Sequence, residues 1–234
     1  MQKKSQIILL ILLLFAMFIV NYRFLDSALE GFLISEERVV VERIIDGDTI
    51  VVNESSVRLL GINSPERGED YYAEAKEFLE NLILNKSVEL EFGQEKDKYG
   101  RGLAYVFLNG ENVNVEMVEK GFANYYFYSG REKYSRELVD AWETCIANEK
   151  NLCEKSVDVC AGCIFVEGKS IVNDCDFDCD VSGWKIHGEG RKYFVFSGVI
   201  FSGEEIGFDL DLSNSGGSLF LRDEEGNLIL WEEN

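Results

Sequence analysis

Polar side chains able to bind a metal ion and a phosphate group occur in three short segments of the sequence. The segments are Asp46-Gly47-Asp48-Thr49, residues 58–66 (RLLGINSPE) and residues 97–102 (DKYGRG). Hard cations such as Ca²⁺ prefer carboxylate, amide and carbonyl oxygens as ligands. Arginine provides planar, permanently charged donors that fit phosphate oxygens. These residue types together predict metal-assisted phosphodiester hydrolysis, in which fixed positive charge stabilises the charge that develops during attack.

The spacing of the acidic and amide residues predicts where they meet. Asp48 follows an Asp-Gly turn between strand-forming residues, so its carboxylate is expected at the rim of a hairpin. Asn63 and Ser64 end a neighbouring strand and would offer an amide oxygen and a backbone carbonyl to the same place. Glu66 lies just beyond them and is near enough to orient or deprotonate a water molecule.

Taken singly, these residues also have purely structural interpretations. Asp48 could be a turn residue, Arg58 a surface charge on a strand, and Arg101 the ion-pair partner of Asp97. Glu66 could cap the helix expected after it. The catalytic interpretation is favoured because all the structural alternatives would have to hold at once.

Composition narrows the chemistry further. The chain has one histidine, His187, too few for enzymes that need several imidazoles as bases or metal ligands. The net charge is −20, which argues against a tight passive nucleic-acid binder, since such proteins neutralise phosphates with basic side chains. An enzyme that holds phosphate locally through a metal ion and a few arginines remains consistent with this charge.

The hydrophobic pattern predicts the elements that carry these segments. Strands are expected between residues 39 and 60 and again at 86–92 and 102–108, and helices are expected at 69–84, 112–120 and 131–148. Five short strands with a helix after the third predict a small closed barrel of the OB type.

The three polar segments, in this order and spacing, resemble those of the staphylococcal nuclease (thermonuclease) family over Val41 to about Lys155. The resemblance implies a calcium-dependent endonuclease, a phosphodiesterase that cuts DNA and RNA and leaves 3′-phosphates. It implies catalytic roles for Arg58, Glu66 and Arg101. It implies one Ca²⁺ held by Asp48, Asn63 and the backbone carbonyl of Ser64. It implies a substrate groove, with a preference for single strands, lined by Lys98, Tyr99, Tyr126 and Tyr128.

One residue departs from the family pattern. The family prototype has an aspartate where this chain has Asn63, so one negative charge is missing from the expected metal site. The alternative function is therefore a catalytically weak or inactive OB-fold module that binds nucleic acid as an adaptor at the cell surface.

Residues 156–234 are predicted to form a second domain after a first at 37–155. The stretch from Asp180 to Ile186, with later strand-like runs, resembles the lamin-tail family and implies an immunoglobulin-like β-sandwich, with Trp184 in its core. This part carries five basic and 16 acidic side chains, so a protein or surface partner is expected rather than nucleic acid. The whole protein is expected to be a monomer.

The first 36 residues predict export. Lys3 and Lys4 precede an uncharged apolar run, Ile7 to Val20, which is typical of a signal anchor or of a cleaved signal peptide. The protein is therefore expected outside the cytoplasm, either membrane-anchored or secreted. The six cysteines are expected to form structural disulfides there, with a structural zinc site as the alternative. They are Cys145, Cys153, Cys160, Cys163, Cys175 and Cys179.

Overall fold

The computed structural model describes residues 37–127, 130–131, 133–190, 192–210 and 217–233. The expected signal anchor at residues 1–36 and the candidate groove residue Tyr128 lie outside these ranges. Within the described ranges, every helix is too short or too polar to cross a bilayer.

The first part of the chain is built around one mainly antiparallel sheet. Its hydrogen-bonded strand order is β1-β6-β7-β4-β3-β2, with β8 beside β7. The strands are β1 (Glu37–Val40), β2 (Arg43–Asp46), β3 (Thr49–Val52), β4 (Ser55–Leu59), β6 (Ser87–Lys96), β7 (Gly102–Leu108) and β8 (Glu111–Asn112). Among the described residues no ladder joins β2 back to β1, so closure of the barrel stays a prediction.

The β3–β4 hairpin sets the register that the site depends on. Its turn residues Asn53 and Glu54 have φ values of 46° and 60°, the left-handed pair of a two-residue turn whose twist matches the strands. The turn is therefore confined to these two residues, and β4 begins at Ser55. The register that follows pairs Thr49 with Arg58.

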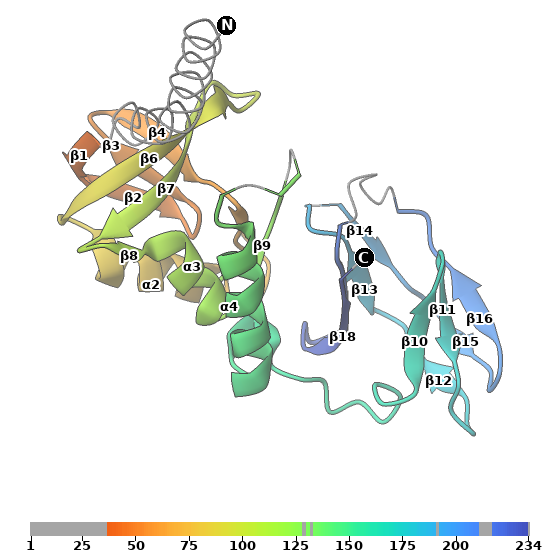
Figure 1. Ribbon diagram of the computed structural model, residues 1–234. Helices are drawn as coiled ribbons and strands as arrows, with labels where there is room; N and C mark the ends of the chain where they lie inside the picture. The colour runs from red at the N-terminus through yellow and green to blue at the C-terminus, as the bar shows by residue number, and fades with distance from the viewer. Residues whose placement is uncertain (1–36, 128–129, 132, 191, 211–216, 234) are drawn as a thin grey trace, which may run out of the picture. The chain divides into compact units, whose positions relative to one another are not determined.

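Among the described residues, α2 and α3 pack against this sheet, and α4 packs against α3 and β9 (Asn124–Tyr125) (Figure 1). The predicted helix at 69–84 begins later, at Tyr72, because residues 66–69 form a turn in which the Glu69 amide donates to the Glu66 carbonyl. α2 buries the apolar face that its sequence period predicts. The helices are α2 (Tyr72–Ile83), α3 (Val113–Glu119) and α4 (Ser135–Asn148).

The second part of the chain forms small antiparallel sheets. One has the order β10-β11-β16, a second pairs β12 with β15, and a third has the order β14-β13-β17-β18. Their bounds are β10 (Ile164–Glu167), β11 (Ser170–Asn173), β12 (Cys179–Asp180), β13 (Lys185–His187), β14 (Tyr193–Val195), β15 (Val199–Ile200), β16 (Glu205–Gly207), β17 (Leu219–Arg222) and β18 (Leu228–Glu232). The fold is thus mixed β with three helices, followed by β-rich sheets, and the immunoglobulin-like sandwich stays a prediction.

β17, an inner strand of the β14-β13-β17-β18 sheet, is buried on both faces, which alternate along the strand. Ile186 and Leu221 are paired in the register and lie in the core of the second part, together with Trp184, as expected for that tryptophan. Phe220 lies on the opposite face and belongs to the core of the first part. The indole nitrogen of Trp231 donates to the Tyr125 hydroxyl at 2.9 Å. Residues 38–234 accordingly form one compact unit.

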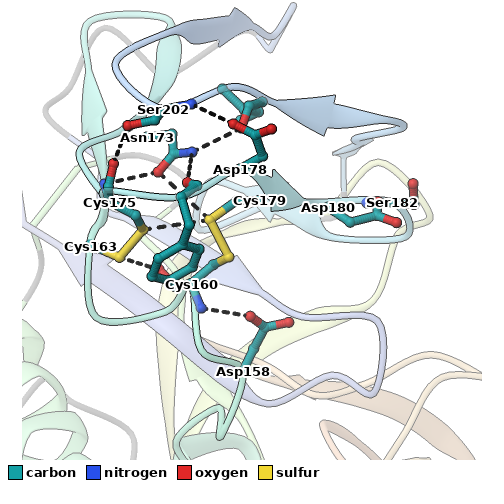
Figure 2. Close-up of a disulfide and its surroundings, with 12 residues drawn as sticks. Asp158, Cys160, Cys163, Asn173, Cys175, Asp178, Cys179, Asp180, Ser182 and Ser202 are labelled. Atoms are coloured by element: carbon teal, nitrogen blue, oxygen red, sulfur yellow. Dashed lines mark hydrogen bonds between the residues drawn. A yellow bond between two sulfur atoms is a disulfide. The ribbon is translucent and has the colours of Figure 1, made fainter.

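The cysteines form disulfides, as expected for an extracytoplasmic protein. One bridge ties the last turn of α4 to η1 (Asn151–Cys153). The other two lie side by side and join the segment just before β10 to the segment from Cys175 to Cys179 (Figure 2). The pairs are Cys145–Cys153, Cys160–Cys179 and Cys163–Cys175. No described cysteine is free, so the structure supports the disulfides over the alternative of a structural zinc site.

Candidate active site

The carboxylate of Asp48 is the centre of the candidate site. It lies in the tight turn between β2 and β3 and is 1% exposed. Gly47 permits this turn, because a Cβ at that position would lie 2.8 Å from the Ser64 Cβ and 2.9 Å from the Ala75 Cβ. The segment around Ser64 and the start of α2 therefore close directly over the turn that holds Asp48.

Arg58 connects this carboxylate to the segment that follows β4. One terminal nitrogen, Nη2, donates to Asp48 Oδ2 at 3.1 Å and to Asn63 Oδ1 at 3.0 Å. The other, Nη1, donates to the carbonyl oxygens of Leu59 at 3.1 Å and Ile62 at 2.9 Å. A surface position for this arginine is excluded, because the residue is 8% exposed and a buried guanidinium needs such acceptors.

Arg101 reaches the same cluster from the start of β7. Its Nη1 donates to the Thr49 hydroxyl at 3.3 Å, and that hydroxyl donates to Asp48 Oδ1 at 2.9 Å. Its Nε donates to Asp97 Oδ2 at 2.6 Å, so the predicted structural pairing exists alongside the contact with the site. Burial raises the pKa of Asp97, but hydrogen bonds from Arg101 and Tyr99 outweigh it and hold that pKa below its usual value.

The oxygens expected to bind a cation converge around one point. Asp48 Oδ2 and Asn63 Oδ1 both lie within 3.1 Å of the same Arg58 nitrogen. Ser64 contacts Asp48 through its amide, which donates to Oδ2 at 3.1 Å; the role expected for its carbonyl stays a prediction. The Asp48 carboxylate and the Asn63 amide oxygen are the kinds of ligand that a hard cation takes.

Asp46 lies beside Asp48, whose backbone amide donates to Asp46 Oδ1 at 3.2 Å, although the predicted ligand set did not include it. Burial and the neighbouring charge of Asp48 raise the pKa of Asp46. Two carboxylates that disfavour each other's ionisation are a common feature of sites that bind cations. The signal was available in the sequence, because the Asp-Gly-Asp spacing places both acids at one tight turn.

Glu66 lines a depression of about 230 Å³ together with Asn63 and Ser64. Its amide donates to Glu69 Oε2 at 2.7 Å within the turn before α2. It does not cap that helix: the N-cap residue is Tyr71, and no side-chain hydrogen bond caps the helix. The structure therefore brings Glu66 to the same surface as the oxygens of Asn63 and Ser64 and removes its structural alternative.

The predicted groove residues have mixed positions. Tyr99 is 70% exposed, and Lys98 and Arg101 lie beside its ring, with cation-to-centroid distances of 5.0 Å and 5.4 Å. Tyr126 is partly exposed. Tyr125 is buried, and its burial raises the pKa of its hydroxyl to about 12, so this neighbour of Tyr126 belongs to the core.

Comparison with known proteins assigns a family to this arrangement. Residues 56–155 match the family model described as staphylococcal nuclease homologue. The thermonuclease of Staphylococcus intermedius is 35% identical over 130 residues, which cover 51% of this chain and 77% of that protein. The chain belongs to the staphylococcal nuclease family. The thermonuclease of Staphylococcus hyicus is also 35% identical, over 129 residues that cover 50% of this chain and 76% of that protein.

The family match covers most of the candidate site. An endonuclease of Bacillus subtilis (strain 168), YncB, is 35% identical over 109 residues, which cover 41% of this chain and 52% of that protein. The family model spans Arg58, Glu66 and Arg101. The part of the chain after residue 155 lies outside the family model.

Proposed function

We propose that this protein is a calcium-dependent endonuclease that hydrolyses phosphodiester bonds of DNA and RNA and leaves 3′-phosphate ends. As a homologue of named thermonucleases and endonucleases, it is a phosphodiesterase of the hydrolase class. The observation that carries the finer proposal is one continuous polar network. It runs from Arg101 through Thr49 and Asp48 to Arg58 and Asn63.

Each residue of the network has a chemical task in this proposal. Asp48, Asn63 and the Ser64 carbonyl would hold Ca²⁺, with Asp46 beside them, and the ion would supply positive charge next to the phosphate. Arg101 hydrogen bonds to the phosphate oxygens, where charge grows during attack, and such fixed donors stabilise the transition state more than the ground state. Arg58 holds Asp48 and Asn63 in place and adds positive charge beside them.

Glu66 is the proposed general base. A base must lie within hydrogen-bonding reach of the water that it deprotonates, and Glu66 lines the depression that also contains Asn63 and Ser64. The substrate strand would continue past Lys98 and Tyr99, where an exposed ring flanked by two cations offers a surface for stacking a base. Tyr126 and Tyr128 stay proposed groove residues on the family resemblance.

The rest of the chain supports a location outside the cytoplasm. Three disulfides persist only in an oxidising compartment. The finer proposal is that residues 1–36 anchor the protein in the membrane or act as a signal peptide, and that residues 156–234 are a lamin-tail-like domain. That domain would contact a protein or cell-surface partner.

The test is hydrolysis of heat-denatured DNA and of RNA by the full chain, with calcium and then with excess chelator. We expect cleavage only with calcium, and DNA product 3′ ends that a terminal transferase extends only after treatment with a 3′-phosphatase. Binding without turnover, with calcium or with manganese, would instead support the adaptor alternative.

A further inference from the structure

We propose that Lys185 and Tyr193, from the second part of the chain, form a subsite that binds the nucleic-acid strand next to the active site. Lys185 would bind a backbone phosphate and Tyr193 would stack on a base. The inference rests on the proposed nuclease function, and it assigns substrate contacts to a region that the family match does not cover.

The first observation is shared geometry. The depression that contains Asn63, Ser64 and Glu66 is also lined by Lys185, His187 and Tyr193. A strand held at the candidate active site would therefore meet side chains of β13 and β14 without leaving one surface.

The register of the sheet explains why these side chains face the depression. Lys185 and His187 lie on the same side of β13, because they flank the inward-facing Ile186. His187 pairs with Tyr193 on β14 and with Phe220 on β17. Phe220 packs into the core of the first part, and Lys185 and Tyr193 continue the same sheet face.

The second observation is that the two basic side chains lining the depression, Arg222 and Lys185, differ in their hydrogen-bond and ion-pair partners. Arg222 also lines the depression, but it is 6% exposed and its guanidinium donates to the carbonyl oxygens of Leu152 at 2.6 Å and Gly226 at 3.0 Å. Within the part of the chain that the structure describes, no hydrogen bond or ion pair engages the Lys185 ammonium. Glu69 and Asp70 line the same depression, yet Lys185 is not their ion-pair partner, so its charge is available to a phosphate.

The third observation concerns the aromatic ring. Tyr193 is 54% exposed at an edge strand, and base stacking on such rings tolerates any sequence. Gly190 lines the depression as well, and a Cβ at that position would lie 3.6 Å from the ring of Tyr126. The predicted groove residue Tyr126 thus borders the depression that Tyr193 lines.

The test compares substrates of two lengths in the full chain. We expect Lys185→Ala to raise KM for a single-stranded DNA 12-mer about three- to tenfold, to leave kcat unchanged, and to leave hydrolysis of a mononucleotide nitrophenyl phosphodiester unchanged. Lys185→Arg should retain wild-type KM. Lys169→Ala removes the same charge from the exposed β10–β11 turn and should have no effect. An equal effect of both alanine variants would overturn the proposal, as would an equal loss on both substrates.

Binding of the 12-mer by Tyr193 variants and the salt dependence of its Kd provide two further, independent tests. Tyr193→Ala should weaken binding of the 12-mer about fivefold or more, whereas Tyr193→Phe should retain it. Phe201, which lies in the second part of the chain and is 56% exposed, is the aromatic control. Phe201→Ala should bind the 12-mer with the wild-type Kd. In Lys185→Ala the slope of log Kd against log salt should fall by about 0.7.

Measurements of Kd distinguish failure of the subsite proposal from failure of the proposed nuclease function. Kd values are measured by anisotropy of a labelled 12-mer with chelator present, so they need no turnover. A wild-type protein without turnover whose Kd responds to Lys185→Ala would contradict the nuclease and keep the subsite. A cutting enzyme whose Kd ignores both Lys185→Ala and Tyr193→Ala would contradict the subsite and keep the nuclease.

Discussion

At the scale of single residues, the site depends on how buried charges are compensated. Asp48 accepts hydrogen bonds from Arg58, Thr49 and Ser64, so its charge stays paired in a position almost without solvent. Arg58 in turn has protein acceptors for both terminal nitrogens. Such satisfied polar networks resist rearrangement, which is what a site needs if its donors are to be in place before the substrate arrives.

A titration prediction belongs to this scale. Burial, and then the positive charge of Arg222, lower the pKa of His187 to about 4, from 6.5 in the unfolded chain. The unfolded state therefore binds the proton first, and stability falls as pH drops from about 6.5 towards 4. Between pH 7 and 4.5 this histidine should remove about 2 kcal/mol from the free energy of unfolding.

His187→Phe isolates that contribution, since it keeps a ring against Phe220, on which His187 stacks at a centroid distance of 5.0 Å, and cannot titrate. Urea denaturation at both pH values should show a smaller acid loss in the variant than in the wild-type protein. The same acid loss in both proteins would contradict the lowered pKa of His187.

At the scale of elements, the sequence predicted the first part of the chain well and the connections less well. The β3–β4 register follows from a two-residue turn in which Asn53 and Glu54 both have positive φ, and α2 and β7 match their predicted runs closely. The turn at Glu66 was missed, because its hydrogen bonds to Glu69 depend on a local geometry that periodicity does not report.

A glycine pair tests how closely the elements pack. Gly121 follows α3 with φ of 73°, and a Cβ there would overlap the Lys150 carbonyl oxygen and lie 2.9 Å from the Cys145 sulfur. Gly110 has φ of 88° but no atom within 4 Å of such a Cβ. Both alanine variants carry a backbone strain of about 1 kcal/mol, so the difference between them measures the steric contact.

We expect Gly121→Ala to lower the free energy of unfolding by about 3 kcal/mol or more, and Gly110→Ala by about 1 kcal/mol. Urea titration of the two variants under the same conditions measures both. Equal destabilisation would contradict the close approach of η1 to the end of α3.

At the scale of the whole molecule, the two parts of the chain share a core. Phe220 and Trp231 pack against residues of the first part, and the Tyr125 hydroxyl bonds to Trp231 and Ser218. Sequence reasoning placed a boundary near residues 150–163 and could not predict this packing. A strand alternating two apolar faces, as β17 does, does not reveal which neighbour covers each face.

Arg222 provides a test of this coupling. Burial lowers its pKa to about 10, so it remains charged at neutral pH, and it donates to Leu152, Gly226 and Asn124. Arg222→Met should cost about 3 kcal/mol, because it leaves buried acceptors unsatisfied. It should also split one cooperative unfolding transition into two.

The control for that measurement is Arg136→Met, since Arg136 is exposed on α4 with a side chain 91% accessible. It should change stability by less than about 0.5 kcal/mol. A single unchanged transition in Arg222→Met would mean that the two parts unfold together without this residue.

The central claim is that the network around Asp48 is a nuclease active site with Glu66 as its base. The most direct test of this claim is the single-turnover rate of cleavage of denatured DNA with saturating calcium. Glu66→Gln keeps the shape of the side chain and removes its basicity. We predict that the rate falls by about 100-fold or more, whereas Glu74→Gln, an exposed position in the first turn of α2, cuts at the wild-type rate. Wild-type cleavage by Glu66→Gln would contradict the account.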